Sequence, residues 1–278
     1  MALVLNEEQV MLKDSAAGFL AEKASVAQLR ELRDSDSEQG YGESVWREMA
    51  EMGWAGIAIP EEFGGLGYGY TGLGLVLEQA GRHLSVSPLQ STVLVAATLV
   101  AELGNPQQKE QLLPAIAAGE KLVTLALQEG AHHAPEQVAA SATADGDDWV
   151  LNGCKVLVAD AHVADSFIFI ARSGGAAGDG NGLSAFLVDA GSEGLSVERR
   201  SMVDSRNSGV LSLEDVRVSA DRLMGPAGDA GVGLNRALDI ANIGLAAELL
   251  GLSTEAFERT VEYLKERKQF GRVIGSFQ

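Results

Sequence analysis

The spacing of apolar residues changes twice along the chain, and these changes constrain the fold more than any single motif. Up to about residue 119, apolar residues such as Leu12, Ala16 and Phe19 recur every three or four positions, which is the period of an amphipathic helix. From about Leu122, short apolar runs separated by glycine-rich loops are typical of strands. After Gly225 the helical period returns. The order predicts helices, then a β unit, then one long helix.

Local signals indicate where the first helices begin and end. Asn6 and Gln9 have the spacing of a capping box, in which each side chain bonds the backbone of the other residue. A second helix fits Ser44–Met52, and Gly53 suits its carboxyl end because glycine tolerates positive φ. Further helices are expected over Gly72–His83 and Ser91–Leu103.

The middle of the chain contains two dipeptides that favour β-hairpins. Asn152-Gly153 and Asp145-Gly146 each adjoin residues with strand-like patterning, and such dipeptides are strong hairpin signals. Further strands are expected at Ser166–Ala171, Leu183–Val188 and Val210–Val218. Together they predict an antiparallel β domain.

The final helix is expected from about Val232 to Lys268, a length of roughly 55 Å at 1.5 Å per residue. Gly244 and Gly251 interrupt it, which indicates close helix packing. It carries one continuous apolar stripe, formed by Leu245, Leu249, Leu252, Phe257, Val261 and Leu264. One helix cannot bury this stripe alone, so we expect an incomplete carboxy-terminal helical bundle.

Composition excludes several classes of protein. The 278 residues include 21 Lys and Arg against 39 Asp and Glu, a net charge of −18, which disfavours nucleic-acid binding because phosphate contacts rely on basic residues. No apolar run approaches the ~20 residues that cross a membrane, and no secretory signal is visible. The single cysteine, Cys154, indicates a reducing compartment. We therefore expect a cytoplasmic protein that binds neither nucleic acid nor membrane.

Ordered sequence motifs resemble those of the acyl-CoA dehydrogenase family. They are Val45–Trp54, Pro60–Gly67, Gln108–Pro114 with Ala118–Lys121, Leu213–Val218 with Leu223–Gly225, and Glu266–Gln278. The last of these is the most diagnostic, and the segment Ala246–Gly251 is similar to a bacterial branch that includes heteromeric and steroid side-chain dehydrogenases. The chain is thus identified as a family member, apparently truncated within its last bundle.

The resemblance implies an α+β multidomain fold. Its parts would be a helical domain over 1–121, a central antiparallel β-barrel domain over 122–230 and the start of a helical bundle over 231–278. It also implies FAD, an acyl-CoA substrate, an electron-transfer flavoprotein or similar acceptor, and a homo- or heterotetramer. In the family reaction, a carboxylate removes the α-proton while the β-hydrogen leaves as hydride to the flavin, which performs the redox step.

The tail motif implies contacts to the FAD of a neighbouring subunit. The residues are Arg267, Gln269, Phe270, Ile274 and Gln278. A guanidinium can pair with a pyrophosphate, and Phe270 can supply an apolar wall. From the residues alone, a solvated basic helix end stays open as the alternative, because these cations also suit the helix dipole.

Three positions on the expected flavin-facing segments depart from the family pattern. Gln128 precedes Glu129 where members carry Thr, and its amide can still donate to a flavin carbonyl. Leu157 stands where a Trp usually lies against the ring, and Ala159 replaces a hydroxyl residue. The loop that usually meets acyl-CoA contains His132-His133, which we interpret as loop residues because no metal-ligand spacing accompanies them.

No catalytic base is identified, so the catalytic residue is unknown. Ala241 occupies the position where a minority of the family carries the base, and Asn242 follows it in place of Arg. Glu248 lies two turns further along and is interpreted as a packing or hydrogen-bonded residue. Asp204 with Arg206 leaves open an acid and an arginine near a ligand, but we interpret the pair as a structural ion pair or a solvated loop. Cys154 is interpreted as a buried structural thiol.

Two functions of different classes remain at this point. The first is an FAD-dependent acyl-CoA dehydrogenase, as subunit or fragment, with a steroid-like or branched acyl group. The second is a non-catalytic flavin- or CoA-binding partner subunit of a heteromeric dehydrogenase, which the replacements at Leu157, Ala159 and Ala241 favour. An oxidase or monooxygenase with the same fold also stays open, because fold alone does not fix chemistry.

Overall fold

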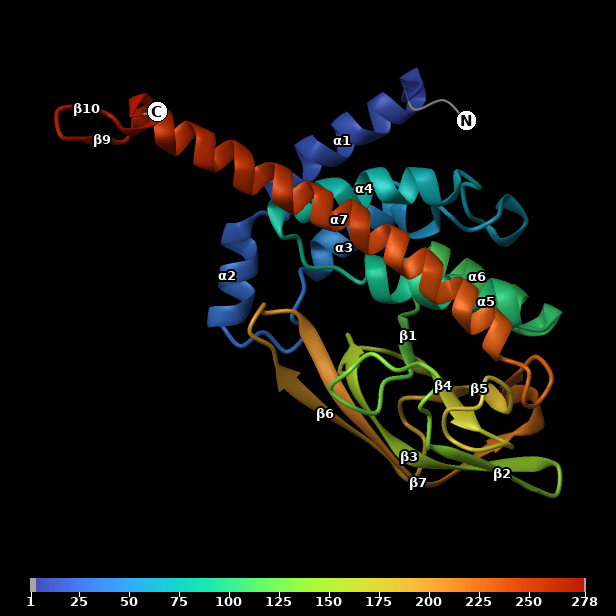
Figure 1. The fold of residues 1–278 in the computed structure, drawn as a ribbon. Helices are drawn as coiled ribbons and strands as arrows, with labels where there is room; N and C mark the ends of the chain where they lie inside the picture. Colours follow the sequence, from blue (N-terminus) through green and yellow to red (C-terminus); the bar gives the residue numbers. More distant parts are fainter. Residues whose placement is uncertain (1–3, 278) are drawn as a thin grey trace.

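The structure is a computed structural model and describes residues 4–277. Its first half is helical (Figure 1). The helices are α1 (Glu7–Lys23), α2 (Val26–Asp34), α3 (Glu43–Glu51), α4 (Gly69–His83), the π-helix η3 (Leu89–Ala96), α5 (Ala97–Leu103) and α6 (Pro106–Ala117), with short 3₁₀ turns at η1 (Trp54–Gly56) and η2 (Glu61–Phe63). The capping box is confirmed, since the Gln9 amide donates to Asn6 Oδ1 at 2.8 Å and the Asn6 amide to Gln9 Oε1 at 3.0 Å. Gly53 ends the second predicted helix with φ of 80°.

The predicted closed antiparallel barrel is wrong. The sheet order is β6-β7-β3-β2-β4-β5-β8, with β1 also beside β4. Its strands are β1 (Val123–Ala126), β2 (Ser141–Asp145), β3 (Asp148–Ala159), β4 (Ser166–Arg172), β5 (Leu183–Asp189), β6 (Leu195–Ser201), β7 (Asn207–Ser219) and β8 (Leu223–Met224). Both β1 and β2 run parallel to β4, so the sheet is mixed. The strands at the two ends of the order, β6 and β8, do not pair with each other, so the sheet stays open.

Only one of the two predicted hairpins forms. Asp145 pairs with Asp148 across the turn that contains Gly146. At Gly153, by contrast, β3 runs straight through and its register against β7 shifts by one residue. A Cβ on Gly153, whose φ is +147°, would lie 2.5 Å from the Ala140 Cβ. This close approach requires glycine. The extra residue of the register shift lies on β7, where Glu214 and Asp215 oppose Asn152, so the dipeptide faces a bulge and forms no turn.

The long helix α7 (Gly231–Glu266) confirms the prediction and packs along α4 (Figure 1). A Cβ on Gly251 would lie 1.8 Å from the Glu78 carbonyl oxygen, and one on Gly244 would lie 2.2 Å from Leu94 Cδ2. The two glycines therefore allow the close packing that the sequence predicted. Further along the helix, Phe257 is 69% exposed. By length and composition alone α7 could cross a membrane, because its most apolar 18-residue window has a mean hydropathy of 1.2.

Two hydrophobic cores hold the chain together. One fills the helical half and includes Leu20, Met49 and Leu73. The other lies against the sheet and includes Phe167 and, from α6, Ile116. Because α6 packs with the sheet, the cores do not follow the expected division at residue 121, and the domain boundaries stay a prediction.

Candidate functional site

The end of β3 forms an apolar shelf at the surface of the sheet. The backbone amide of Val156 donates to the Gln128 carbonyl at 2.7 Å, which places two of the predicted flavin-facing segments side by side. A register shift between Lys155 and Val158 and a φ of +54° at Leu157 turn the strand locally. As a result, Leu157 is 49% exposed, and Ala159 is exposed as well. We call Leu157 and Ala159 the shelf.

A buried ion pair fixes the segment that carries Gln128. Lys155 is 0% exposed, and its Nζ donates to Glu129 Oε1 at 2.6 Å and to the Leu127 carbonyl at 3.1 Å. Glu129 also accepts from the backbone amides of Ala139 and Ala140. Burial lowers the pKa of Lys155 to about 8, although Glu129 opposes that shift. Burial raises the pKa of Glu129, but the bonds from Lys155 and the two amides outweigh it and leave that pKa low.

The Gln128 side chain is engaged locally. Its amide Nε2 donates to the Gly130 carbonyl at 2.9 Å and to the His132 carbonyl. A donation to flavin would require it to leave these partners.

A cavity of about 340 Å³ opens beside the shelf. It lies between the end of α4, the end of β3, the start of β7 and one face of α7. Its lining includes Ala159 and Asp160, the loop residues Leu84 and Val86, the polar residues Gln90, Ser91, Asp204 and Arg206, and the α7 residues Leu245, Glu248, Leu249 and Leu252. This volume falls within the range typical of small-molecule sites.

A carboxylate, a guanidinium and an amide meet in this cavity. Glu248 is only 9% exposed, and its two oxygens accept from Arg206 and Gln90 respectively. Arg206 also donates to the Ser85 carbonyl at 3.3 Å. We call Gln90, Arg206 and Glu248 the polar floor. The interpretation of Glu248 as a hydrogen-bonded residue is confirmed, because both oxygens are engaged.

Asp160 and Leu84 line the same cavity with strained backbone conformations, and Asp160 also brings a carboxyl group. Both have positive φ, 52° and 51° respectively, a conformation that costs energy in residues other than glycine and that clusters at functional sites. Burial raises the pKa of Asp160, while hydrogen bonds from Ser91 at 2.5 Å and Asn207 at 3.1 Å oppose the shift.

Of the interpretations of Asp204 with Arg206, only the ion pair is wrong: Asp204 is an exposed loop residue, and both residues line the cavity. Asp204 Oδ1 accepts from the Arg206 backbone amide at 3.0 Å, whereas the Arg206 guanidinium pairs with Glu248. Arg206 and Glu248 are 42 positions apart, so no local pattern signalled their contact.

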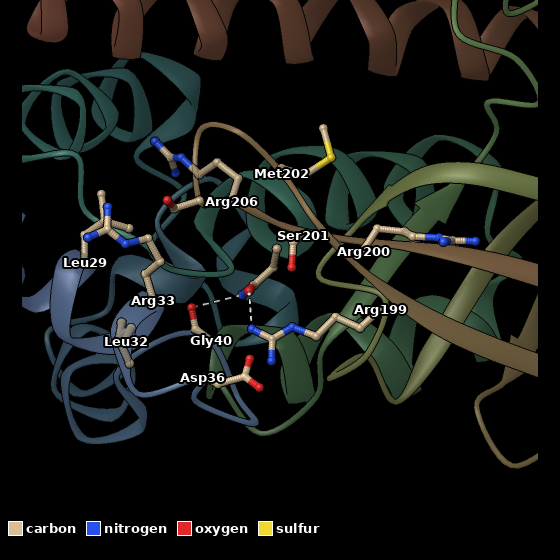
Figure 2. Close-up of a pocket in the computed structure, with 12 residues that line it drawn as sticks. Leu29, Leu32, Arg33, Asp36, Gly40, Arg199, Arg200, Ser201, Met202 and Arg206 are labelled. Carbon is tan, nitrogen blue, oxygen red and sulfur yellow. Dashed lines mark hydrogen bonds between the residues drawn. The ribbon is translucent and has the colours of Figure 1, made fainter.

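A second cavity of about 430 Å³ shares Arg206 with the first, and Figure 2 shows the residues that line it. Four arginines line it, namely Arg33, Arg199, Arg200 and Arg206. Figure 2 shows that Arg199 and Arg200 point in different directions. Three of the four pair with carboxylates, while Arg199 bonds the Ser37 carbonyl at 2.6 Å. Because the charge is compensated and the side chains do not converge, we assign no ligand to this cavity.

The tail forms a small unit at the far end of α7 from the sheet (Figure 1). It contains the antiparallel pair β9 (Lys268–Gln269) and β10 (Arg272–Val273), followed by the turn η5 (Ile274–Ser276). Phe270 is 93% exposed and has a φ of 49°, and the Ile274 amide donates to the Arg267 carbonyl at 2.8 Å. Gln278 lies outside the described residues. Within one chain, the tail and the shelf are therefore not brought together.

The structure places the other residues that the sequence singled out, a cysteine, two histidines and two positions on α7. Cys154 is exposed rather than buried, because it lies on the opposite face of β3 from the buried residues Leu151 and Lys155. His132 and His133 are exposed loop residues, and no cluster of three potential metal ligands occurs among residues 4–277. Ala241 and Asn242 lie on α7 and bear no carboxylate, so the described residues supply no base at that position.

The residues at the shelf fit a flavin. The exposed aliphatic surface of Leu157 and Ala159 can support an apolar ring. Ser208, which pairs with Ala159 across the sheet, has a buried hydroxyl without a partner among the described residues. Such an orphaned group is expected where a ligand supplies the missing bond.

Comparisons with known proteins identify the family. Models of the acyl-CoA dehydrogenase N-terminal, middle and C-terminal domains match residues 6–120, 127–216 and 232–278. The 3-(aryl)acrylate reductase of Clostridium sporogenes is 31% identical over 87% of this chain and 66% of its own length. The short-chain acyl-CoA dehydrogenase of Clostridium acetobutylicum is 31% identical over 84% of this chain and 62% of its own.

A solved steroid ACAD matches with a TM-score of 0.86 and 36% identity, covering 98% of this chain and 70% of that one. The chain thus spans about two thirds of the length of the curated relatives it matches. Three consecutive domain models and this conserved fold lead to one conclusion: the chain belongs to the acyl-CoA dehydrogenase family.

Proposed function

We propose that the protein acts as an FAD-dependent acyl-CoA dehydrogenase that introduces a double bond between the α- and β-carbons of an acyl-CoA thioester. The observation that carries the proposal is the position of Ala159, which belongs both to the shelf and to the lining of the 340 Å³ cavity. An acyl group in this cavity would therefore lie next to a flavin on the shelf.

The chain's own residues hold the two reactants and shape the site. Leu157 and Ala159 support the ring, and the buried pair of Lys155 with Glu129 keeps the neighbouring Gln128 segment in place. The apolar residues of α7 exclude water from the acyl group. When bound, FAD accepts the hydride that leaves the β-carbon.

The base is not assigned to a residue of this chain. Glu248 faces the cavity, but its oxygens are held by Arg206 and Gln90. To take a proton from a substrate, the carboxylate would have to leave these two partners. Glu248 is therefore a structural member of the site in this proposal.

The flavin is proposed to bind between the shelf of one chain and the tail of a second copy. Arg267, Gln269, Phe270 and Ile274 would form the second wall, with Gln278 beyond the described residues. The tail's exposed aromatic surface supports this arrangement, since Phe270 is 93% exposed. A tetramer follows as the proposed assembly, and a cytoplasmic location and an electron-transfer flavoprotein as acceptor complete the proposal. A relative named as part of a caffeyl-CoA reductase–Etf complex supports that acceptor.

The substrate is proposed to be a branched or steroid-type acyl-CoA, which the likeness to the steroid ACAD supports. The non-catalytic subunit is the less favoured alternative, because the relatives described above are named as enzymes.

The test is an anaerobic titration of the FAD-loaded protein with acyl-CoA esters, followed by flavin absorbance. Loss of the oxidised-flavin band on adding a thioester is the expected result. Phe270→Ala should abolish FAD retention, while Val203→Ala, at an exposed position far from the tail motif, should retain it. FAD uptake without bleaching by any ester would favour the non-catalytic subunit, and failure to take up FAD would contradict the proposal.

A further inference from the structure

The cavity beside Ala159 combines an apolar wall with the polar floor. The wall consists of aliphatic side chains from α2, from the loop after α4 and from α7, namely Leu29, Leu84, Val86, Leu245, Leu249 and Leu252. The α7 members recur at intervals of four and three residues, so they share one helix face. Glu248 lies on the same face, one turn after Leu245. A ligand on this wall therefore reaches the polar floor.

The polar floor retains unused hydrogen-bonding capacity. A guanidinium has five N–H donors, and Arg206 uses donors on Glu248 and on the Ser85 carbonyl. Gln90 donates to Glu248, while its own carbonyl oxygen receives no bond from the described residues. Donors and acceptors are thus both available at this end of the cavity.

These groups determine which ligand ends are tolerated. A hydrocarbon end would remove these partly exposed groups from water and return no hydrogen bond, which is costly for the polar groups that binding buries. A carboxylate end would meet the Glu248 carboxylate, whose charge already compensates Arg206. A hydroxyl or keto oxygen can accept from Arg206, and a hydroxyl can also donate to Gln90 Oε1.

We propose that the cavity selects acyl-CoA esters whose acyl group carries an uncharged oxygen function, a hydroxyl or a keto group, where it meets Gln90, Arg206 and Glu248. This inference rests on the proposed function and names its substrate class.

The first experiment measures binding without turnover. Three non-reactive thioether analogues of one acyl-CoA skeleton, ending in hydroxyl, methyl or carboxylate, are titrated into the FAD-loaded protein by calorimetry. Because hydrogen bonds to charged groups dominate the difference, the hydroxyl analogue should bind about 10-fold or more tightly than the methyl analogue. It should also bind more tightly than the carboxylate analogue. Equal or tighter binding of either competitor would overturn the inference.

Variants of the polar floor and of the apolar wall show which of the two gives the preference for the hydroxyl analogue. Gln90→Leu should move the hydroxyl-to-methyl ratio of Kd values only part of the way towards one, because Arg206 remains as the charged donor, and Arg206→Leu should move it further. Leu249→Met, a volume-conserving change in the apolar wall, should leave the ratio unchanged. The corresponding thioesters should show the same preference in kcat/KM. Bleaching by both esters without preference would refute the substrate class alone. Failure of every analogue to bind and of every ester to bleach would refute the proposed function itself.

Discussion

The close packing of α7 on α4 predicts opposite effects for the same substitution at two helical glycines. In Gly251→Ala the new Cβ would lie 1.8 Å from the Glu78 carbonyl oxygen and 3.0 Å from the Arg82 amide nitrogen. Both are backbone atoms, so the helices themselves must separate. In Gly18→Ala, in the interior of α1, no atom lies within 4 Å of the new Cβ.

The comparison isolates the cost of this contact. Alanine gains about 1 kcal/mol over glycine in a helix interior at either position, so this gain cancels between the two variants. Overpacking costs typically 1–3 kcal/mol, so Gly251→Ala should be about 1–3 kcal/mol less stable than Gly18→Ala. Gly18→Ala itself should be more stable than the wild type.

Urea unfolding of the three proteins gives the free energies from the transition midpoints at a common slope. Equal stability of the two variants, within about 0.5 kcal/mol, would refute the packing argument. Substitutions at exposed positions without special contacts change the free energy of unfolding by about that amount.

Three further predictions concern buried charges. Lys155 has a folded pKa of about 8 against 10.5 for the free side chain, so unfolding takes up a proton between these pH values. The stability of the wild type relative to Lys155→Met should therefore rise as pH increases from about 8 to 10.5. A stability difference that does not change with pH in chemical denaturation would contradict this. Arg172 donates to the carbonyls of residues 136, 138, 179 and 181 at 2.8–3.0 Å. Arg172→Lys should therefore lower the free energy of unfolding by about 2 kcal/mol and speed amide hydrogen exchange in the loops around residues 136–138 and 179–181. Unchanged exchange there would contradict this. Glu248→Gln should lower the free energy of unfolding by only about 1 kcal/mol, because the Arg206 side chain is 34% exposed. The loss of melting temperature should disappear when Arg206→Met is already present, and a loss that persists there would contradict the pairing.

Features that depend on neighbouring residues were predictable from the sequence. The Asn6–Gln9 capping box is confirmed because both partners lie within one helical turn. The long helix and the close packing at Gly251 followed from periodicity and from glycines that interrupt it. Each of these signals is local, so tertiary packing did not change its meaning.

Features that depend on distant segments were not predictable in this way. The hairpin expected at Asn152-Gly153 does not form, because β3 continues through the dipeptide and pairs with β7, while Ala140, just before β2, packs against the glycine. Cys154 is exposed on the face of this strand opposite to Leu151 and Lys155. The polar floor joins Gln90 to Glu248 over 158 positions, a separation that no periodic pattern encodes.

The central claim, a flavin held between the shelf of one chain and the tail of a second copy, is tested most directly by subunit complementation. Leu157→Asp would damage the shelf and Phe270→Ala the tail, both at exposed side chains. Each variant alone should retain no FAD. Co-expressed, the two should form mixed assemblies in which an intact shelf meets an intact tail, and FAD content should return in part. If the mixture binds no more FAD than either variant alone, or if one variant alone binds as the wild type does, the flavin does not lie at this junction.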